Sequence, residues 1–182
     1  MEPLESDSRK VQVLTPRTYE LIGRIVTKAS YLEFAIFFMA TSANSELETD
    51  FTDVLKSRPL LLKRAKDALD KYAREIKIPN FLSRDLYFEK VAQALDARDA
   101  VAHGIVRRID DLGFMAYHPR GKKNVPIDDQ SLEEIYSILD KLEAEAYLMR
   151  NIIWERIKDS RLIQIDALDT DHLEIQPGTR LG

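Results

Sequence analysis

The sequence predicts an all-α fold, a bundle of four to five helices with a small β-hairpin insertion near residues 105–118. Apolar residues recur every three or four positions over most of the chain, which is the spacing of amphipathic helices. Glycine and proline are sparse, at 6 and 7 of 182 residues, and this favours long helices over a turn-rich β fold. The segment from 105 to 127 departs from the helical spacing.

The length fits one domain with a full hydrophobic core. We expect this helical domain over residues 15–159, between a flexible N-terminus of residues 1–14 and a loose C-terminal tail of residues 160–182. Within the tail, the apolar residues at 162–165 predict a short strand.

The first helix is predicted from Thr15 to about Ser42, because Thr15 supplies a capping hydroxyl and Pro16 suits the first helical position. A short helix is expected over 50–56, and another opens at Pro59 and runs to about residue 75.

The next helix is predicted from Ser83 to His103, with Gly104 as a left-handed C-cap. Residues 105–109 and 114–118 then flank a turn and predict the hairpin, which a basic loop follows.

The last helix starts at Asp128 or Ser131 and ends near residue 159, and Ser131 with Glu134 fits a capping box. Its apolar residues alternate steps of three and four, as in the seam of a bundle. They are Leu132, Ile135, Leu139, Leu142, Ala146, Met149 and Ile153.

Composition excludes several classes of protein. The absence of cysteine excludes disulfides and thiolate metal sites. The charged N-terminus is unlike a secretory signal, and no apolar run approaches the roughly 18 residues of a membrane span, so we expect a cytoplasmic protein. The formal net charge of -4 disfavours a general nucleic-acid coat protein.

Two charged residues fall where a helical wheel expects apolar ones, Glu33 in the first helix and Arg98 in the helix before the hairpin. Burying a charge that has no partner lowers the stability of the fold by roughly several kcal/mol. Either the two residues pair across helices, or one or both line a polar cleft with His103. The readings are compatible, because a carboxylate can orient a catalytic guanidinium.

The segment from Arg98 to Gly104 carries the candidate chemistry, because it gathers Arg98, Asp99 and one of the three histidines, His103, at a helix end. Asp99 and His103 are four residues apart, which stacks their side chains one turn from each other.

Basic residues follow this histidine in a local excess over Asp110 and Asp111. This excess predicts an RNA-binding surface, and the alternative is a solvated loop. The basic residues are Arg107, Arg108, Arg120, Lys122 and Lys123.

A subunit interface is predicted on the first helix, where Tyr31, Phe34 and Phe38 lie opposite the main apolar stripe. A helix that is apolar nearly all round is buried on both sides, so we expect a homodimer. Alternatively, the hairpin or the C-terminal tail covers these aromatic residues.

Residues 98–104 resemble the signature of the HEPN superfamily, an arginine followed after four to six residues by a histidine, with a polar residue after the arginine. The likeness extends over the helical region, residues 16–159, and implies a HEPN-like bundle. Many members are metal-independent endoribonucleases of toxin-antitoxin and defence systems, acting as dimers. The resemblance implies His103 as general acid or base, Arg98 as the group that stabilises phosphate charge, and Asp99 as a residue that orients His103.

Other branches of the superfamily are helical interaction or regulatory modules, including partners of nucleotidyltransferases. A non-catalytic module is therefore the alternative to an RNA-cleaving enzyme, and an enzyme of another class is a third. We expect no cofactor, since no Gly-rich phosphate loop is present. We also expect no metal, and interpret Asp166, Asp169, Asp171 and His172 as solvated charge.

Overall fold

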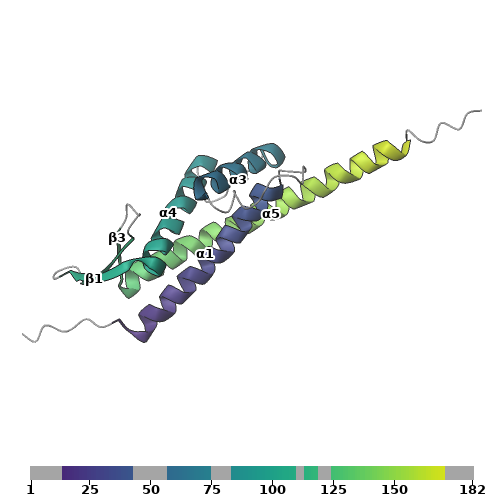
Figure 1. The fold of residues 1–182 in the computed structure, drawn as a ribbon. Helices are drawn as coiled ribbons and strands as arrows, with labels where there is room; N and C mark the ends of the chain where they lie inside the picture. Colours follow the sequence, from purple (N-terminus) through teal and green to yellow (C-terminus); the bar gives the residue numbers. More distant parts are fainter. Residues whose placement is uncertain (1–13, 43–56, 75–82, 110–112, 119–123, 171–182) are drawn as a thin grey trace, which may run out of the picture. The chain divides into compact units, whose positions relative to one another are not determined.

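The computed structural model describes residues 14–42, 57–74, 83–109, 113–118 and 124–170, with side chains up to residue 159. This part of the chain is mostly helical and has one small sheet (Figure 1), as predicted. Its elements in chain order are α1 (Pro16–Ser42), α3 (Arg58–Tyr72), α4 (Arg84–His103), β1 (Ile105–Ile109), β2 (Gly113–Tyr117), β3 (Asn124–Pro126) and α5 (Asp129–Thr170).

Local capping chemistry sets two helix starts where the sequence predicts them. Thr15 Oγ1 accepts a hydrogen bond from the Thr18 backbone N–H at 3.1 Å, just before α1. Ser83 Oγ accepts one from the Leu86 backbone N–H at 3.1 Å at the start of α4. Each bond satisfies a backbone donor that has no partner within its helix.

The predicted left-handed cap at Gly104 is wrong, because Gly104 is extended, with φ -72° and ψ 157°, and the chain passes directly into β1. Glycine is required here for a different reason. A Cβ atom at this position would lie 2.1 Å from the Ala100 carbonyl oxygen, so α4 and β1 join only where a side chain is absent.

The sheet is larger than the predicted hairpin, since β3 adds a third strand in the order β1-β2-β3, all antiparallel. A strand of three residues ending in Pro126 gives no alternating pattern, so the sequence assigns this segment to a loop. Gly113 has a positive φ of 74° where β2 begins.

The predicted end of the last helix is also wrong, because α5 continues to Thr170 through residues 162–165, where a strand was expected. A short apolar run fits a helix or a strand equally well. At its N-terminus Asp128 provides the cap: Oδ1 accepts from the Ser131 backbone N–H and Oδ2 from the Ser131 hydroxyl, both at 2.8 Å. The helix expected over 50–56 and both chain ends lie outside the described residues.

The chain divides into two compact units. The first comprises residues 1–34 and 78–145 and contains α4, the sheet and the N-terminal parts of α1 and α5. Its core includes the fully buried Tyr87, whose hydroxyl donates to the Leu142 carbonyl oxygen at 3.0 Å. Burial raises the pKa of Tyr87, with nearby Glu145 adding to the shift. This unit holds every residue of the predicted site that the structure describes.

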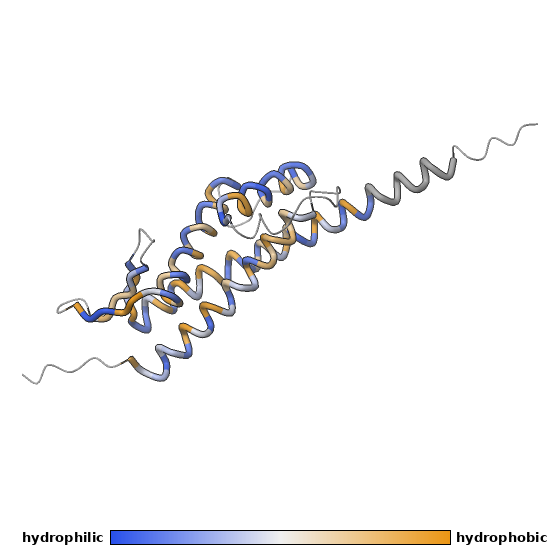
Figure 2. The backbone as a smooth tube through the Cα atoms, viewed as in Figure 1, coloured by the Kyte–Doolittle hydropathy of each residue, from blue (hydrophilic) through white to orange (hydrophobic). Residues whose placement is uncertain are grey.

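The second unit comprises residues 35–77 and 146–182, with α3 and the C-terminal parts of α1 and α5. Apolar and polar residues alternate along its helices (Figure 2), and the apolar ones form its core. None of the described helices is both long enough and apolar enough to cross a membrane. The buried core residues of this unit are Ala35, Ile36, Met39, Ala40, Leu61, Ala65, Ala68, Leu69, Ala73, Ala146, Met149, Ile153 and Ile157.

Candidate functional site

Arg98 links α4 to α1 through the ion pair that the helical wheel suggests. Its Nη2 donates to Glu33 Oε1 at 2.5 Å, and its Nε lies 3.2 Å from Asp99 Oδ1. The Arg98 side chain is only 13% exposed, and its Nε is buried without a well-aligned hydrogen bond. Two carboxylates therefore neutralise one nearly buried guanidinium, as a charge inside an apolar stripe requires.

One guanidinium nitrogen of Arg98, Nη1, is left to donate a hydrogen bond to another group. Glu33 engages Nη2 and Asp99 faces Nε, whereas Nη1 has no bond within the described part of the chain. The Glu33 side chain is 34% exposed, so this pair lies at the margin of the core. The arrangement thus combines a structural link between helices with one guanidinium nitrogen left for another ligand.

His103 has a different setting from Arg98. It is exposed and is the last residue of α4, directly before the Gly104 junction. Five residues along an α-helix correspond to about 7.5 Å of rise and about 140° of rotation. Arg98 and His103 thus leave α4 in different directions, and Asp99 Oδ1 lies against Arg98 Nε.

Two of the five predicted RNA-binding residues lie in the described structure. Arg107 and Arg108 are exposed on β1, a few residues beyond His103 and in the same unit. Successive residues of a strand point to opposite faces, so the two arginines cover both faces of β1. Arg120, Lys122 and Lys123 lie outside the described residues.

The predicted interface aromatics on α1 separate into two groups. Tyr31 and Phe34 are exposed, at 51% and 54%. Phe38 belongs to the second unit, where its ring centroid lies 5.6 Å from that of Trp154 and the Arg150 guanidinium lies over the ring. Part of the predicted interface is therefore covered within the chain, and Tyr31 and Phe34 remain available.

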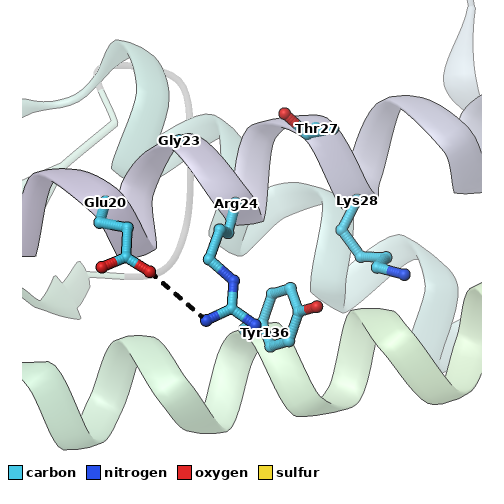
Figure 3. A pocket seen from close by; sticks show the side chains of 6 residues that line it. All are labelled: Glu20, Gly23, Arg24, Thr27, Lys28 and Tyr136. Carbon is cyan, nitrogen blue, oxygen red and sulfur yellow. Dashed lines mark ion pairs between the residues drawn. The ribbon is translucent and has the colours of Figure 1, made fainter. Parts of the chain in front are cut away.

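A groove on the first unit was not predicted (Figure 3). It has a volume of about 340 Å³ and lies between α1 and α5. The Arg24 guanidinium stacks over the Tyr136 ring at 4.2 Å and lies 3.7 Å from Glu20 Oε1. The lining residues are Glu20, Gly23, Arg24, Thr27, Lys28 and Tyr136.

Lys28 closes one end of this groove and is held by two carboxylates of α5. Its Nζ lies 2.8 Å from Asp140 Oδ1 and 2.7 Å from Glu143 Oε2. The hydrogen bonds to Asp140 and then Glu143 raise the pKa of Lys28. Because these charges satisfy one another, the groove is a helix contact and not an anion site. Residues 136, 140 and 143 are spaced to lie on one face of a helix, which the sequence shows. The sequence does not show that this face meets Lys28, because that depends on the register of α1 against α5.

Among the described side chains, no group of three or more His, Asp or Glu could hold a metal ion. The acidic residues at 166, 169 and 171 and His172 lie outside the described side chains.

No protein-family model matches this chain, and no curated protein and no solved structure matches it either. The likeness of residues 98–104 to the HEPN signature therefore stays a prediction from sequence.

Proposed function

We propose that the chain is a HEPN-like, metal-independent endoribonuclease of a toxin-antitoxin or defence system. The observation that carries this proposal is the exposed imidazole of His103 at the end of α4, followed at once by exposed Arg107 and Arg108 on β1. An exposed imidazole can exchange protons with a ribose hydroxyl, and flanking guanidinium groups can hold phosphates.

The proposed reaction needs no metal ion. His103 takes the proton from a 2′-hydroxyl as its oxygen attacks the adjacent phosphorus, or returns a proton to the departing 5′-oxygen. In the dimer that the resemblance implies, Arg98 Nη1 of the second copy stabilises the charge that develops on the phosphate beside His103, while Glu33 and Asp99 of that copy hold the guanidinium in place. Arg107 and Arg108, on the two faces of β1, bind further phosphates of the RNA on either side of the strand. The products are a 2′,3′-cyclic phosphate and a free 5′-hydroxyl.

The test is cleavage of labelled single-stranded and transfer RNAs by the purified chain in excess EDTA. We expect cyclic-phosphate ends, and a rate about 100-fold or more lower for His103→Ala. His118→Ala is the matched control, since it removes another imidazole of the same unit. Intact RNA under all conditions, or equal rates for the two variants, would exclude His103 as the acid or base.

A second candidate function, a non-catalytic helical interaction module, is favoured by the near-complete burial of Arg98 between two carboxylates. The exchange Glu33→Arg with Arg98→Glu, made together with Asp99→Asn so that the new carboxylate does not face a second one, discriminates the two. A module keeps its stability and partner binding after the exchange, because the ion pair is re-formed with reversed polarity. A nuclease keeps its stability but loses cleavage, because α4 then presents a carboxylate to the phosphate.

A homodimer fits both candidates, whereas the other partners depend on which candidate holds. A second copy of the chain would cover Tyr31 and Phe34, which are exposed on α1. For the nuclease, RNA is the substrate and a nucleotidyltransferase-type antitoxin is the cognate partner, as the resemblance implies. We place these activities in the cytoplasm.

A further inference from the structure

Within the described part of the chain, one edge of β1 pairs with no other strand. β1 is an edge strand, and β2 is its one strand partner among the described residues. Val106 pairs with Ala116 of β2, which in turn pairs with Val125 of β3. Direct partners share a face, so these three side chains form one row. Ala116 and Val125 are buried, but Val106 is 41% exposed. The residues that bury this face over β2 and β3 therefore do not bury it over β1.

The other face of β1 is open as well. Ile105 is 52% exposed, and Arg107 on the same face is exposed. A strand with apolar residues exposed on both faces is uncommon in a small sheet, where one face normally packs on the core. The exposed apolar residues of β1 thus indicate that a further layer or strand belongs here.

The two edges of the sheet differ in how they are protected. β3 is only three residues long and ends in Pro126, which has no N–H to donate. β1 has five residues and contains neither proline nor glycine. Proteins usually blunt a free edge against strand addition. The β3 edge is blunted by its length and its proline, whereas β1 carries only the charges of Arg107 and Arg108, which disfavour a basic strand but attract an acidic one.

From this asymmetry we infer that β1 binds an extended acidic segment of a partner protein, which adds to the sheet as a fourth strand. Backbone hydrogen bonds to β1 would supply affinity. Apolar side chains of the segment would contact Ile105 and Val106, and its carboxylates would pair with Arg107 and Arg108 on the two faces. A second copy of β1 fits less well, since antiparallel self-pairing centred on Arg107 places like charges opposite each other.

Binding of such a segment requires only the β1 edge. One consequence rests on the proposed function: the segment would cover the arginines proposed to hold RNA, next to His103, and would inhibit cleavage.

The test uses the full chain and short capped peptides that carry two adjacent valines and two adjacent glutamates, in both orders. Calorimetry should detect binding, and the backbone amides of β1 should gain protection from hydrogen exchange. The same peptides N-methylated at alternate residues should not bind, because they cannot complete the strand pairing. Binding of normal and methylated peptides with equal affinity would reduce the effect to charge alone and overturn the inference.

Variants of the protein provide the second arm. Arg107→Glu should weaken peptide binding by about tenfold and Arg108→Glu by a similar factor, while the same charge reversal at exposed Lys63 on α3 should change nothing. Absence of peptide binding, or protection of β1 by oligouridine but by no peptide, would contradict the inference. RNA cleavage that fails while the peptides bind would reject the proposed nuclease and leave the strand-binding edge intact.

Discussion

At the scale of single residues, Arg98 combines a structural role, which favours burial, with a proposed catalytic role, which requires access to a phosphate. It satisfies two carboxylates at the edge of a core, and it is the arginine of the motif that resembles a nuclease signature. A guanidinium held by carboxylates on two sides is well oriented, because rotation would cost it both contacts. We therefore interpret the cluster as a device that fixes one remaining donor.

A double-mutant cycle measures this link. Arg98→Met and Glu33→Gln should each lower the free energy of unfolding by about 1–2 kcal/mol, below the cost for a fully buried pair because Glu33 is partly exposed. The double variant should lose less than the sum, with a coupling energy of about 1 kcal/mol in urea unfolding. Strict additivity would show that the two side chains do not interact in solution.

Lys28 gives a prediction about pH. Its pKa is raised in the folded protein by the hydrogen bonds to Asp140 and Glu143, so folding favours the protonated amine. Its contribution of about 1 kcal/mol is complete below the unfolded pKa of about 10.4 and is lost as pH rises through the higher folded value. The stability difference between the wild type and Lys28→Met should therefore stay constant from pH 7 to about 10 and shrink above that.

Exposed Lys90 provides the control for that measurement. Lys90→Met should leave the alkaline unfolding profile unchanged. A Lys28→Met difference that is already declining near pH 8 would show that the paired amine is not stabilised in the folded state.

At the scale of elements, the helix starts and the hairpin strands could be predicted from local sequence chemistry. The starts of α1 and α4 follow from a hydroxyl at the cap, and the hairpin strands follow from their position around a turn. The sequence did not show β3 or the extension of α5 to Thr170, because three residues and a short apolar run carry too little pattern.

The candidate site was predictable to a similar extent. The ion pair of Glu33 and Arg98 follows from two charges lying within apolar stripes. The carboxylates around Lys28 do not, because all three residues have an ordinary polar position and only the register of α1 against α5 brings them together.

The two glycines with described surroundings give opposite predictions at this scale. Gly23→Ala should raise the free energy of unfolding by about 0.5–1 kcal/mol, because a Cβ atom there meets nothing within 4 Å and alanine favours the helix. Gly104→Ala should lower it by about 2 kcal/mol or more, because the Cβ atom would collide with the Ala100 carbonyl. Thermal unfolding followed by circular dichroism compares both. Equal effects would contradict the distinct roles assigned to the α4–β1 junction and to mid-helix α1.

At the scale of the whole molecule, the proposed dimer depends on the exposed aromatics of α1. Phe34→Glu should convert the dimer to monomers in sedimentation equilibrium, because it places a charge in the apolar contact. Tyr19→Glu is the matched control, since Tyr19 is also exposed on α1 and was not assigned to the interface. A wild-type chain that is monomeric at high micromolar concentration, or a Phe34→Glu variant that still dimerises, would exclude this surface as the interface.

Proton transfer by an exposed imidazole is the claim on which the proposed nuclease depends, and chemical rescue tests it most directly. Because His103 is open to solvent, free imidazole can occupy the space that His103→Ala vacates. We expect imidazole added to His103→Ala to restore RNA cleavage in EDTA in proportion to its concentration, with cyclic-phosphate ends, and to leave the wild-type rate unchanged. A folded His103→Ala variant that cleaves RNA as fast as the wild type before imidazole is added would contradict the account.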